Sequence, residues 1–207
     1  MQKKSWPNFN KNLISKVSKI LSSGEINYSN GPYGEKFEKE FSKFVGNGYS
    51  VAICNGTAAL EVAIKSLQLP KNSEIIVTAR SFFSSAACIV NTGHIPIFSD
   101  VNLLTQNISL GDIKKKISKR TKAIICVHLA GLPCNMNDIK KLANKNKIKI
   151  IEDCSQAHGA SINNKQVGSF GDVSTWSFCN DKIISTLGEG GMISTNKKKI
   201  YDFCKVY

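Results

Sequence analysis

The regular alternation of short apolar segments with segments of helical spacing constrains the fold more than any other feature. Seven β-branched, apolar segments predict buried strands, at residues 51–53, 74–78, 95–99, 123–128, 149–152, 173–178 and 191–195. Between many of them, apolar residues recur at helical spacing, at residues 58–67, 82–90, 110–117 and 136–143. This alternation predicts an α/β domain of three layers (αβα), with a mostly parallel central sheet and helices on both faces.

Both ends of the chain are predicted to be helical. Two helices, at residues 11–21 and 35–44, precede the first strand, and the turn-forming residues 29–34 connect them. We therefore expect an N-terminal helical segment, 1–30, followed by one domain, 31–207. A last helix at residues 197–207 has no capping glycine or proline after it, so either the domain is incomplete at its C-terminus or this helix frays.

Composition argues against a membrane protein or a secreted one. Of the 207 residues 42% are hydrophobic, enough to bury a core, and no run of eighteen apolar residues is present. The first residues are basic but are not followed by an apolar stretch of seven or more. We expect a cytoplasmic protein that does not bind membranes.

The formal charge of +13 raises the question of nucleic-acid binding. The basic residues are 26 lysines and 2 arginines, and the lysines are scattered along the whole chain. Because nucleic-acid recognition favours arginine and clustered basic patches, we expect a solvated surface and no nucleic-acid partner.

Seven cysteines form no C-x-x-C pair, and their odd number leaves one unpaired in any disulfide scheme. This pattern predicts neither a zinc site nor a disulfide framework. We expect free thiols, with Cys126 and Cys179 buried in apolar runs.

The residues after the first predicted strand form a candidate anion site. In an open α/β sheet, ligands bind at the carboxyl ends of the strands. There Gly56, Thr57 and Ala58 open a helix whose first backbone N–H groups suit a phosphate. Alternatively, Thr57 is an ordinary helix-capping residue.

Two further strand ends carry an aromatic pair and an acidic pair. Phe82 and Phe83 follow the strand at 74–78, and one of them is positioned to stack on a flat ring while the other belongs to the core. Glu152 and Asp153 end another apolar strand, where a carboxylate needs a cationic partner. Alternatively, Asp153 caps a following helix.

A single lysine, Lys182, follows the strand at 173–178, which carries Ser177 near its end. Most lysines of this chain are expected to be surface residues, but this one lies at the strand ends. There an amine can act as a nucleophile and move protons. A phosphate cradle, a stacking aromatic, a carboxylate and an amine are the groups that a pyridoxal 5′-phosphate site requires.

An ordered set of motifs extends over residues 31–195. They are Gly31-Pro32, Phe37-Glu38, Asn55-Gly56-Thr57-Ala58-Ala59-Leu60, Asp100 with Thr105 and Asn107-Ile108, Val127-His128-Leu129-Ala130-Gly131-Leu132-Pro133, Glu152-Asp153, Gln156-Ala157-His158-Gly159-Ala160, Gly168-Ser169, Gly171-Asp172, Ser177-Phe178, Lys182 and Gly188-Glu189-Gly190-Gly191. In the order and spacing of these motifs, the sequence resembles the DegT/StrS-type nucleotide-sugar aminotransferases, a family of fold type I pyridoxal-phosphate enzymes.

The resemblance implies a role for each site residue. Lys182 is the lysine that carries the cofactor and moves the proton, and Asp153 pairs with the pyridine nitrogen. Gln156 contacts the ring hydroxyl and Phe82 stacks on the ring, Phe83 being the less favoured choice. The phosphate contacts are Gly56, Thr57, Ala58 and Ser177. No metal is implied.

The resemblance also implies the reaction. The cofactor would pass an amino group from an amino acid, usually glutamate, to a nucleotide-linked keto-sugar for the synthesis of amino sugars and cell-surface polysaccharides. Family members are homodimers with a smaller C-terminal domain, which is missing here, so residues 31–207 would be the large, cofactor-binding domain. Two alternatives stay open: a sugar dehydratase of the same family, which normally has a histidine in place of Lys182, and a shortened chain that binds the cofactor without turnover.

Overall fold

The computed structural model describes residues 6–207. Residues 1–5 lie outside the described residues. The predicted N-terminal segment, 1–30, is therefore described only from residue 6, and the expectation for the basic first residues lies outside the described part.

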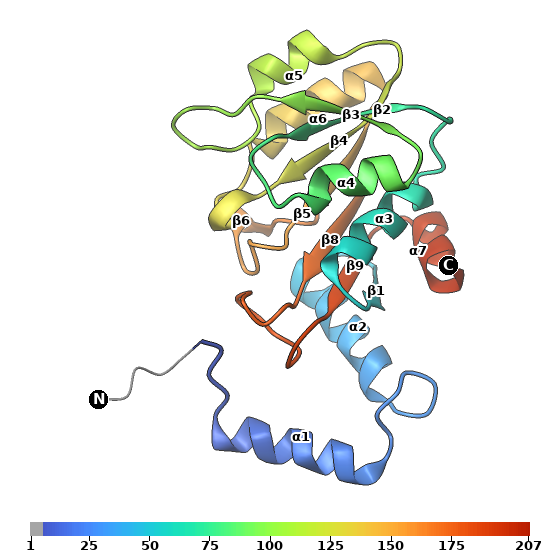
Figure 1. Cartoon of the computed structure of the whole chain (residues 1–207), viewed down its shortest axis with the longest axis vertical. Helices are drawn as coiled ribbons and strands as arrows, with labels where there is room; N and C mark the ends of the chain where they lie inside the picture. Colours follow the sequence, from blue (N-terminus) through green and yellow to red (C-terminus); the bar gives the residue numbers. More distant parts are fainter. Residues whose placement is uncertain (1–5) are drawn as a thin grey trace.

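A central sheet of seven strands forms the middle layer, in the order β1-β9-β8-β5-β4-β2-β3 (Figure 1). Its strands are β1 (Tyr49–Ile53), β2 (Glu74–Thr78), β3 (Ile95–Ser99), β4 (Thr121–Val127), β5 (Lys149–Asp153), β8 (Val173–Ser177) and β9 (Gly191–Thr195). The neighbours from β3 to β8 are parallel, whereas β9 runs antiparallel to both β8 and β1. The expected mostly parallel sheet is confirmed, and the carboxyl ends of six strands lie at one edge.

Helices cover both faces of the sheet, which confirms the three-layer αβα fold (Figure 1). Three of them, α3 (Gly56–Ser66), α4 (Ser84–Asn91) and α7 (Lys198–Val206), pack on one face around a core that includes Ile75 and Ile125. The others, α2 (Tyr33–Val45), α5 (Leu110–Lys116) and α6 (Met136–Asn146), cover the opposite face in two clusters.

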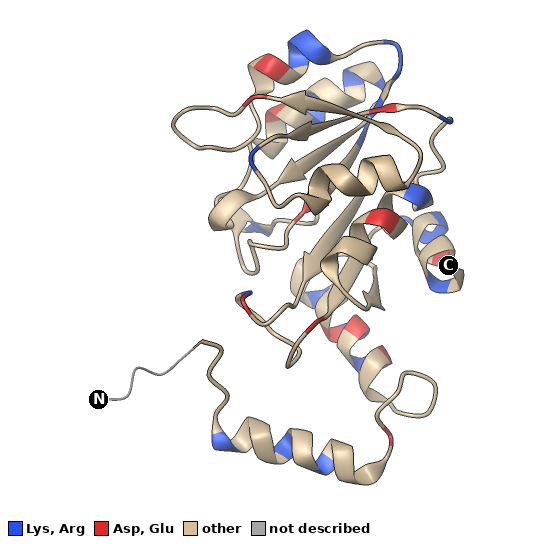
Figure 2. Cartoon of the chain, in the orientation of Figure 1, with Lys and Arg blue, Asp and Glu red and all other residues tan. Residues whose placement is uncertain are grey.

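The helix α1 (Lys11–Ser23) stands apart from these layers (Figure 1). Asn10 caps it by accepting a hydrogen bond from the Leu13 N–H at 2.8 Å, and none of its residues is buried. Figure 2 shows Lys and Arg spread over several helices and loops rather than gathered on one face. Among residues 6–207, no helix has the length and apolar character needed to cross a membrane.

The predicted element boundaries differ from the observed ones by a few residues. Helix α2 begins at Tyr33, so the last two residues of the predicted connecting loop are already helical. Helix α4 begins at Ser84, two residues later than predicted, so Phe82 and Phe83 precede it. The short hairpin of β6 (Ser161–Ile162) with β7 (Lys165–Gln166) and a 3-10 turn (Leu129–Gly131) were not predicted, because elements this short have no periodicity to detect.

Candidate functional site

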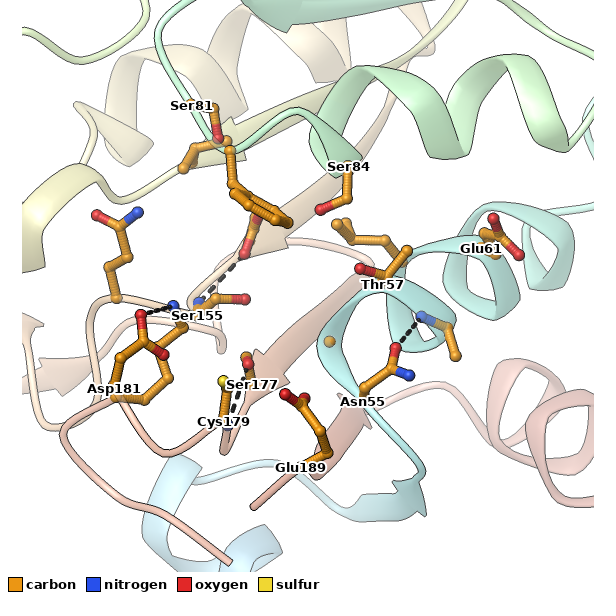
Figure 3. Close-up of a pocket in the computed structure, with 18 residues that line it drawn as sticks. Asn55, Thr57, Glu61, Ser81, Ser84, Ser155, Ser177, Cys179, Asp181 and Glu189 are labelled. Atoms are coloured by element: carbon orange, nitrogen blue, oxygen red, sulfur yellow. Dashed lines mark hydrogen bonds and ion pairs between the residues drawn. The ribbon is translucent and has the colours of Figure 1, made fainter. Parts of the chain in front are cut away.

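A cavity of about 620 Å³ opens at the carboxyl ends of the strands (Figure 3). Its volume is typical of a small-molecule site. The structure brings together all eight residues that the sequence predicted for the site, and each of them lines this cavity: Gly56, Thr57, Ala58, Phe82, Asp153, Gln156, Ser177 and Lys182.

The N-terminus of α3 forms one wall of the cavity. Asn55 caps this helix, because its Oδ1 accepts a hydrogen bond from the Ala58 N–H at 2.8 Å (Figure 3). The alternative in which Thr57 is the capping residue is therefore wrong. Among residues 6–207, the N–H groups of Gly56 and Thr57 have no hydrogen-bond partner. Two free donors at the positive end of a helix dipole suit an anion, whereas the N–H of Ala58 is already used.

Close packing fixes this wall against strand β8. A Cβ atom added to Gly56 would lie 2.8 Å from the Ser177 Cβ, and one added to Gly191 would lie 2.4 Å from the Asn55 carbonyl oxygen. Both positions therefore require glycine. The Ser177 hydroxyl consequently lies directly beside the first turn of α3.

Asp153, at the end of β5, is 5% exposed and presents its carboxylate to the cavity. Its Oδ2 accepts a hydrogen bond from the Ser85 hydroxyl and its Oδ1 one from the Ser155 N–H, both at 3.1 Å. The next element after β5 is the short strand β6 (Ser161–Ile162), so the alternative in which Asp153 caps the following helix is wrong. Both hydrogen bonds compensate the burial of this carboxylate.

Ser85 receives a further contact from Ser81, the two hydroxyl oxygens lying 2.8 Å apart. Ser81 lies in the connection between β2 and α4, Ser85 lies in the first turn of α4, and the hydroxyl of Ser85 is held beside Asp153. Sequence reasoning missed Ser85, since nothing in its local pattern indicates a partner 68 residues away.

Phe82 and Gln156 lie at the mouth of the cavity. Phe82 is 62% exposed and lines the cavity, whereas Phe83, 70% exposed, is absent from its lining. The expectation that one of the two rings belongs to the core is therefore wrong. The Gln156 Oε1 accepts a hydrogen bond from the Ala130 N–H at 2.8 Å, which orients its amide.

Lys182 lies in the loop between β8 and β9, and its side chain is 22% exposed. Its Nζ lies 3.0 Å from the Asp181 Oδ2, and the Asp181 side chain is 66% exposed. An ion pair this exposed contributes little to stability. Lys182 lies on the wall of the same cavity as Asp153, but its direct acidic partner is the neighbouring Asp181, which sequence reasoning missed.

A buried cluster beneath the site contains three potential metal ligands, whose ligand atoms lie within 4.8 Å of one another: His128, Glu152 and Cys154. The Glu152 carboxylate already accepts hydrogen bonds from the N–H groups of Gly168, Phe170 and Gly171 at 2.6–2.8 Å. His128 Nδ1 accepts from the Cys134 N–H, so its Nε2–H donates to Glu152. The Glu152 carboxylate thus holds the loop at 168–171 against β5, and His128 is bonded to that carboxylate.

The seven cysteines are free thiols. Cys126 is fully buried as expected, but Cys179 is only half-buried and lines the cavity, so the prediction of burial is wrong for Cys179.

Together, the sheet order and the groups at its carboxyl edge define an α/β protein in which a helix N-terminus, a buried carboxylate and a lysine surround one cavity. The chain belongs to the DegT/DnrJ/EryC1/StrS aminotransferase family, whose model matches residues 7–207.

Several known proteins are similar to most of the chain. The chain is 43% identical, over 188 residues, to a GDP-perosamine synthase of Escherichia coli O157:H7, a match that covers 91% of the chain and 51% of that relative. The structure matches that of an aminotransferase from Psychrobacter cryohalolentis with a TM-score of 0.97 and 43% identity, covering 99% of this chain and 52% of that one. It also matches NtdA of Bacillus subtilis, solved with bound cofactor PMP, with a TM-score of 0.86 and 31% identity over 92% of this chain and 42% of that one. The chain thus spans about half the length of the relatives it matches.

Proposed function

We propose that this chain is the cofactor-binding part of a pyridoxal-phosphate-dependent aminotransferase that acts on a nucleotide-linked keto-sugar. The observation that carries the proposal is the meeting of Lys182, Asp153 and the first turn of α3 around one cavity of about 620 Å³. The similarity of the chain to a GDP-perosamine synthase supports the substrate class.

The residues present fit the cofactor. The free N–H groups of Gly56 and Thr57 and the hydroxyls of Thr57 and Ser177 form a cradle for its phosphate. Ala58 completes this cradle by contact, since its N–H is bonded to Asn55. When bound, pyridoxal phosphate supplies an aldehyde and a ring that accepts electrons from the substrate.

The side chains of the chain itself would do the rest. Asp153, held by Ser85 and Ser155, would pair with the pyridine nitrogen and keep it protonated. Gln156 would contact the ring hydroxyl and Phe82 would cover the ring. The Nζ atom of Lys182 would act as the nucleophile toward the aldehyde and would then move a proton as a base.

The proposal extends to the whole protein. Glutamate would be the amino donor and the product would be an amino sugar for polysaccharide synthesis. The protein would work as a homodimer in the cytoplasm, with the nucleotide sugar and the amino acid as its small-molecule partners. Lys182, in place of a histidine, favours amino transfer over sugar dehydration.

The proposal is tested by adding glutamate to the chain loaded with pyridoxal phosphate and following the absorbance of the bound cofactor. We expect glutamate to convert the cofactor to its aminated form in the wild type but not in Lys182→Ala. Lys165→Ala, which changes a lysine outside the cavity lining, is the control. Cofactor binding that glutamate leaves unchanged would refute amino transfer by this chain and would support a module that only binds.

A further inference from the structure

Glu38, on helix α2, has a buried carboxylate that the proposed reaction does not use. The residue is 7% exposed and belongs to the Phe37-Glu38 motif. A buried charge is costly unless hydrogen bonds or an opposite charge compensate it. The contacts of Glu38 therefore indicate why a carboxylate is present there.

The two oxygens of this carboxylate have different partners. Oε1 accepts a hydrogen bond from the backbone N–H of Ala52 in β1 at 2.8 Å. Oε2 accepts hydrogen bonds from the Tyr28 hydroxyl and the Lys205 ammonium, both at 3.0 Å. The carboxylate thus joins four parts of the chain: the connection before α2, α2 itself, β1 and α7.

Lys205 remains charged in this cluster. Burial opposes its charge, but hydrogen bonds to Tyr28 and Glu38 outweigh that effect and raise the pKa of Lys205 to about 12. The ammonium also lies 4.5 Å from the centre of the Tyr28 ring. The Oε2 side of Glu38 is therefore compensated by a fixed positive charge.

The Oε1 side acts on an edge strand. Strand β1 pairs only with β9 in the described sheet, so its other edge has no strand neighbour. The Ala52 N–H on that edge donates to Glu38 instead. An edge strand held by one neighbour is the least constrained part of a sheet, and the bond from Glu38 supplies a second attachment.

Strand β1 leads directly into the anion cradle. Ala52 lies three residues before Asn55, which caps α3, and four before Gly56, which lines the cavity and whose N–H has no partner among residues 6–207. The other side of this connection is fixed by the close approach of Gly191 to Asn55. The cradle is thus held between β9 and the bond from Glu38 to Ala52.

We propose that Glu38 is a positioning residue for the anion cradle at the N-terminus of α3, acting through the hydrogen bond from Ala52 to its Oε1. The inference rests on the proposed function only in taking the cradle as a phosphate site. Lys205 and Tyr28 stabilise the charge of Glu38 and have no direct part in positioning.

The test compares two double variants that both remove the charged pair, so that neither leaves a buried ion unpaired. Glu38→Gln with Lys205→Met keeps an oxygen for the Ala52 N–H, whereas Glu38→Met with Lys205→Met does not. The binding of inorganic phosphate is measured from the backbone amide NMR signals of Gly56 and Thr57, and thermal unfolding is measured in parallel.

We expect the methionine variant to bind phosphate about tenfold more weakly than the glutamine variant. The methionine variant has no oxygen at position 38 to accept the hydrogen bond from the Ala52 N–H, whereas the glutamine variant keeps one without a charge. We expect the glutamine variant to bind phosphate as the wild type does, even where its melting temperature is lower. Equal phosphate affinities in the two variants would overturn the proposal. A phosphate affinity that falls in proportion to the melting temperature in both variants would overturn it too. Absence of phosphate binding in the wild type would overturn it as well.

The outcomes separate this proposal from the proposed function. Phosphate binding that depends on Glu38, without attachment of the cofactor to Lys182, would refute the aminotransferase and leave the positioning role standing. Attachment of the cofactor to Lys182, with a phosphate affinity independent of Glu38, would refute the positioning role and leave the aminotransferase proposal standing.

Discussion

Lowering the pH is expected to destabilise the fold through His158, a buried imidazole next to the site. His158 is 7% exposed, and neither of its ring nitrogens has a hydrogen-bond partner among residues 6–207. Its ring packs against Trp176 and Phe178, with centroids 5.3 and 5.5 Å away. Burial, reinforced by the positive charge of Lys182, lowers the pKa of His158 to about 4, although the Ser177 backbone opposes the shift.

The direction of the pH effect on stability follows from the pKa of His158 in the folded and unfolded states. In the unfolded chain the pKa of a histidine is about 6.5, so below that pH the unfolded state binds a proton that folded His158 does not. Stability is therefore unaffected above about pH 6.5 and falls progressively toward pH 4. The difference between these pKa values corresponds to a loss of about 2 kcal/mol at pH 5 and about 3 kcal/mol at pH 4.

Denaturant unfolding, followed by the fluorescence of buried Trp176, measures this loss at a series of pH values. His158→Leu is the comparison, because it removes the titrating ring and leaves no hydrogen-bond partner unsatisfied. We expect the variant to lose about 2 kcal/mol less than the wild type between pH 7 and pH 5. Carboxylates titrate in both proteins and cancel in the comparison. Parallel pH profiles for the two proteins would refute the neutral, buried imidazole.

Three further substitutions test the packing of the site. Gly56→Ala should lower the free energy of unfolding by about 1–3 kcal/mol, because its Cβ would lie 2.8 Å from the Ser177 Cβ. Gly111→Ala is the control and should not lower it, because its nearest contact is 3.7 Å away. Equal effects of the two substitutions would contradict the close-packing argument. Ser85→Ala should slow the reaction of the cofactor-loaded chain with glutamate about tenfold, because Asp153 loses a hydrogen-bond donor. Ser85→Thr, which keeps a hydroxyl, should restore the rate. An unchanged rate in Ser85→Ala would show that Asp153 is held without the Ser85 hydroxyl. Glu152→Gln should lower the free energy of unfolding by about 3 kcal/mol, because one amide oxygen cannot replace a carboxylate that accepts hydrogen bonds from three backbone N–H groups. A melting temperature equal to that of the wild type would contradict this prediction.

Periodicity predicted most of the elements that build the fold. The strands at 74–78, 95–99 and 191–195 have the predicted bounds, because each is a run of apolar or β-branched residues with clear polar or glycine neighbours. The antiparallel direction of β9 could not be predicted, since no local pattern distinguishes the two directions. The predicted starts of α1, α5 and α6 agree with the structure, whereas α3 begins two residues earlier than predicted, because its capping residue Asn55 precedes the apolar pattern.

The site was predictable where its residues lie at or a few residues beyond the carboxyl ends of strands. Asp153, Ser177 and Lys182 meet at the cavity because the carboxyl ends of parallel strands lie at one edge of a sheet. The residues that hold the walls of the site in place were not predicted. Ser85 beside Asp153 and Glu38 beside Ala52 are contacts between separate elements, and their geometry depends on how the helices pack on the sheet.

The most direct test of the central claim is to identify the lysine to which pyridoxal phosphate becomes attached. The loaded chain is reduced with borohydride, digested, and its labelled peptide is sequenced by mass spectrometry. The chain has 26 lysines, so attachment to Lys182 alone, and its loss in Lys182→Ala, is the result predicted by the geometry of the cavity. A label on another lysine, or one spread over the surface lysines, would contradict the account.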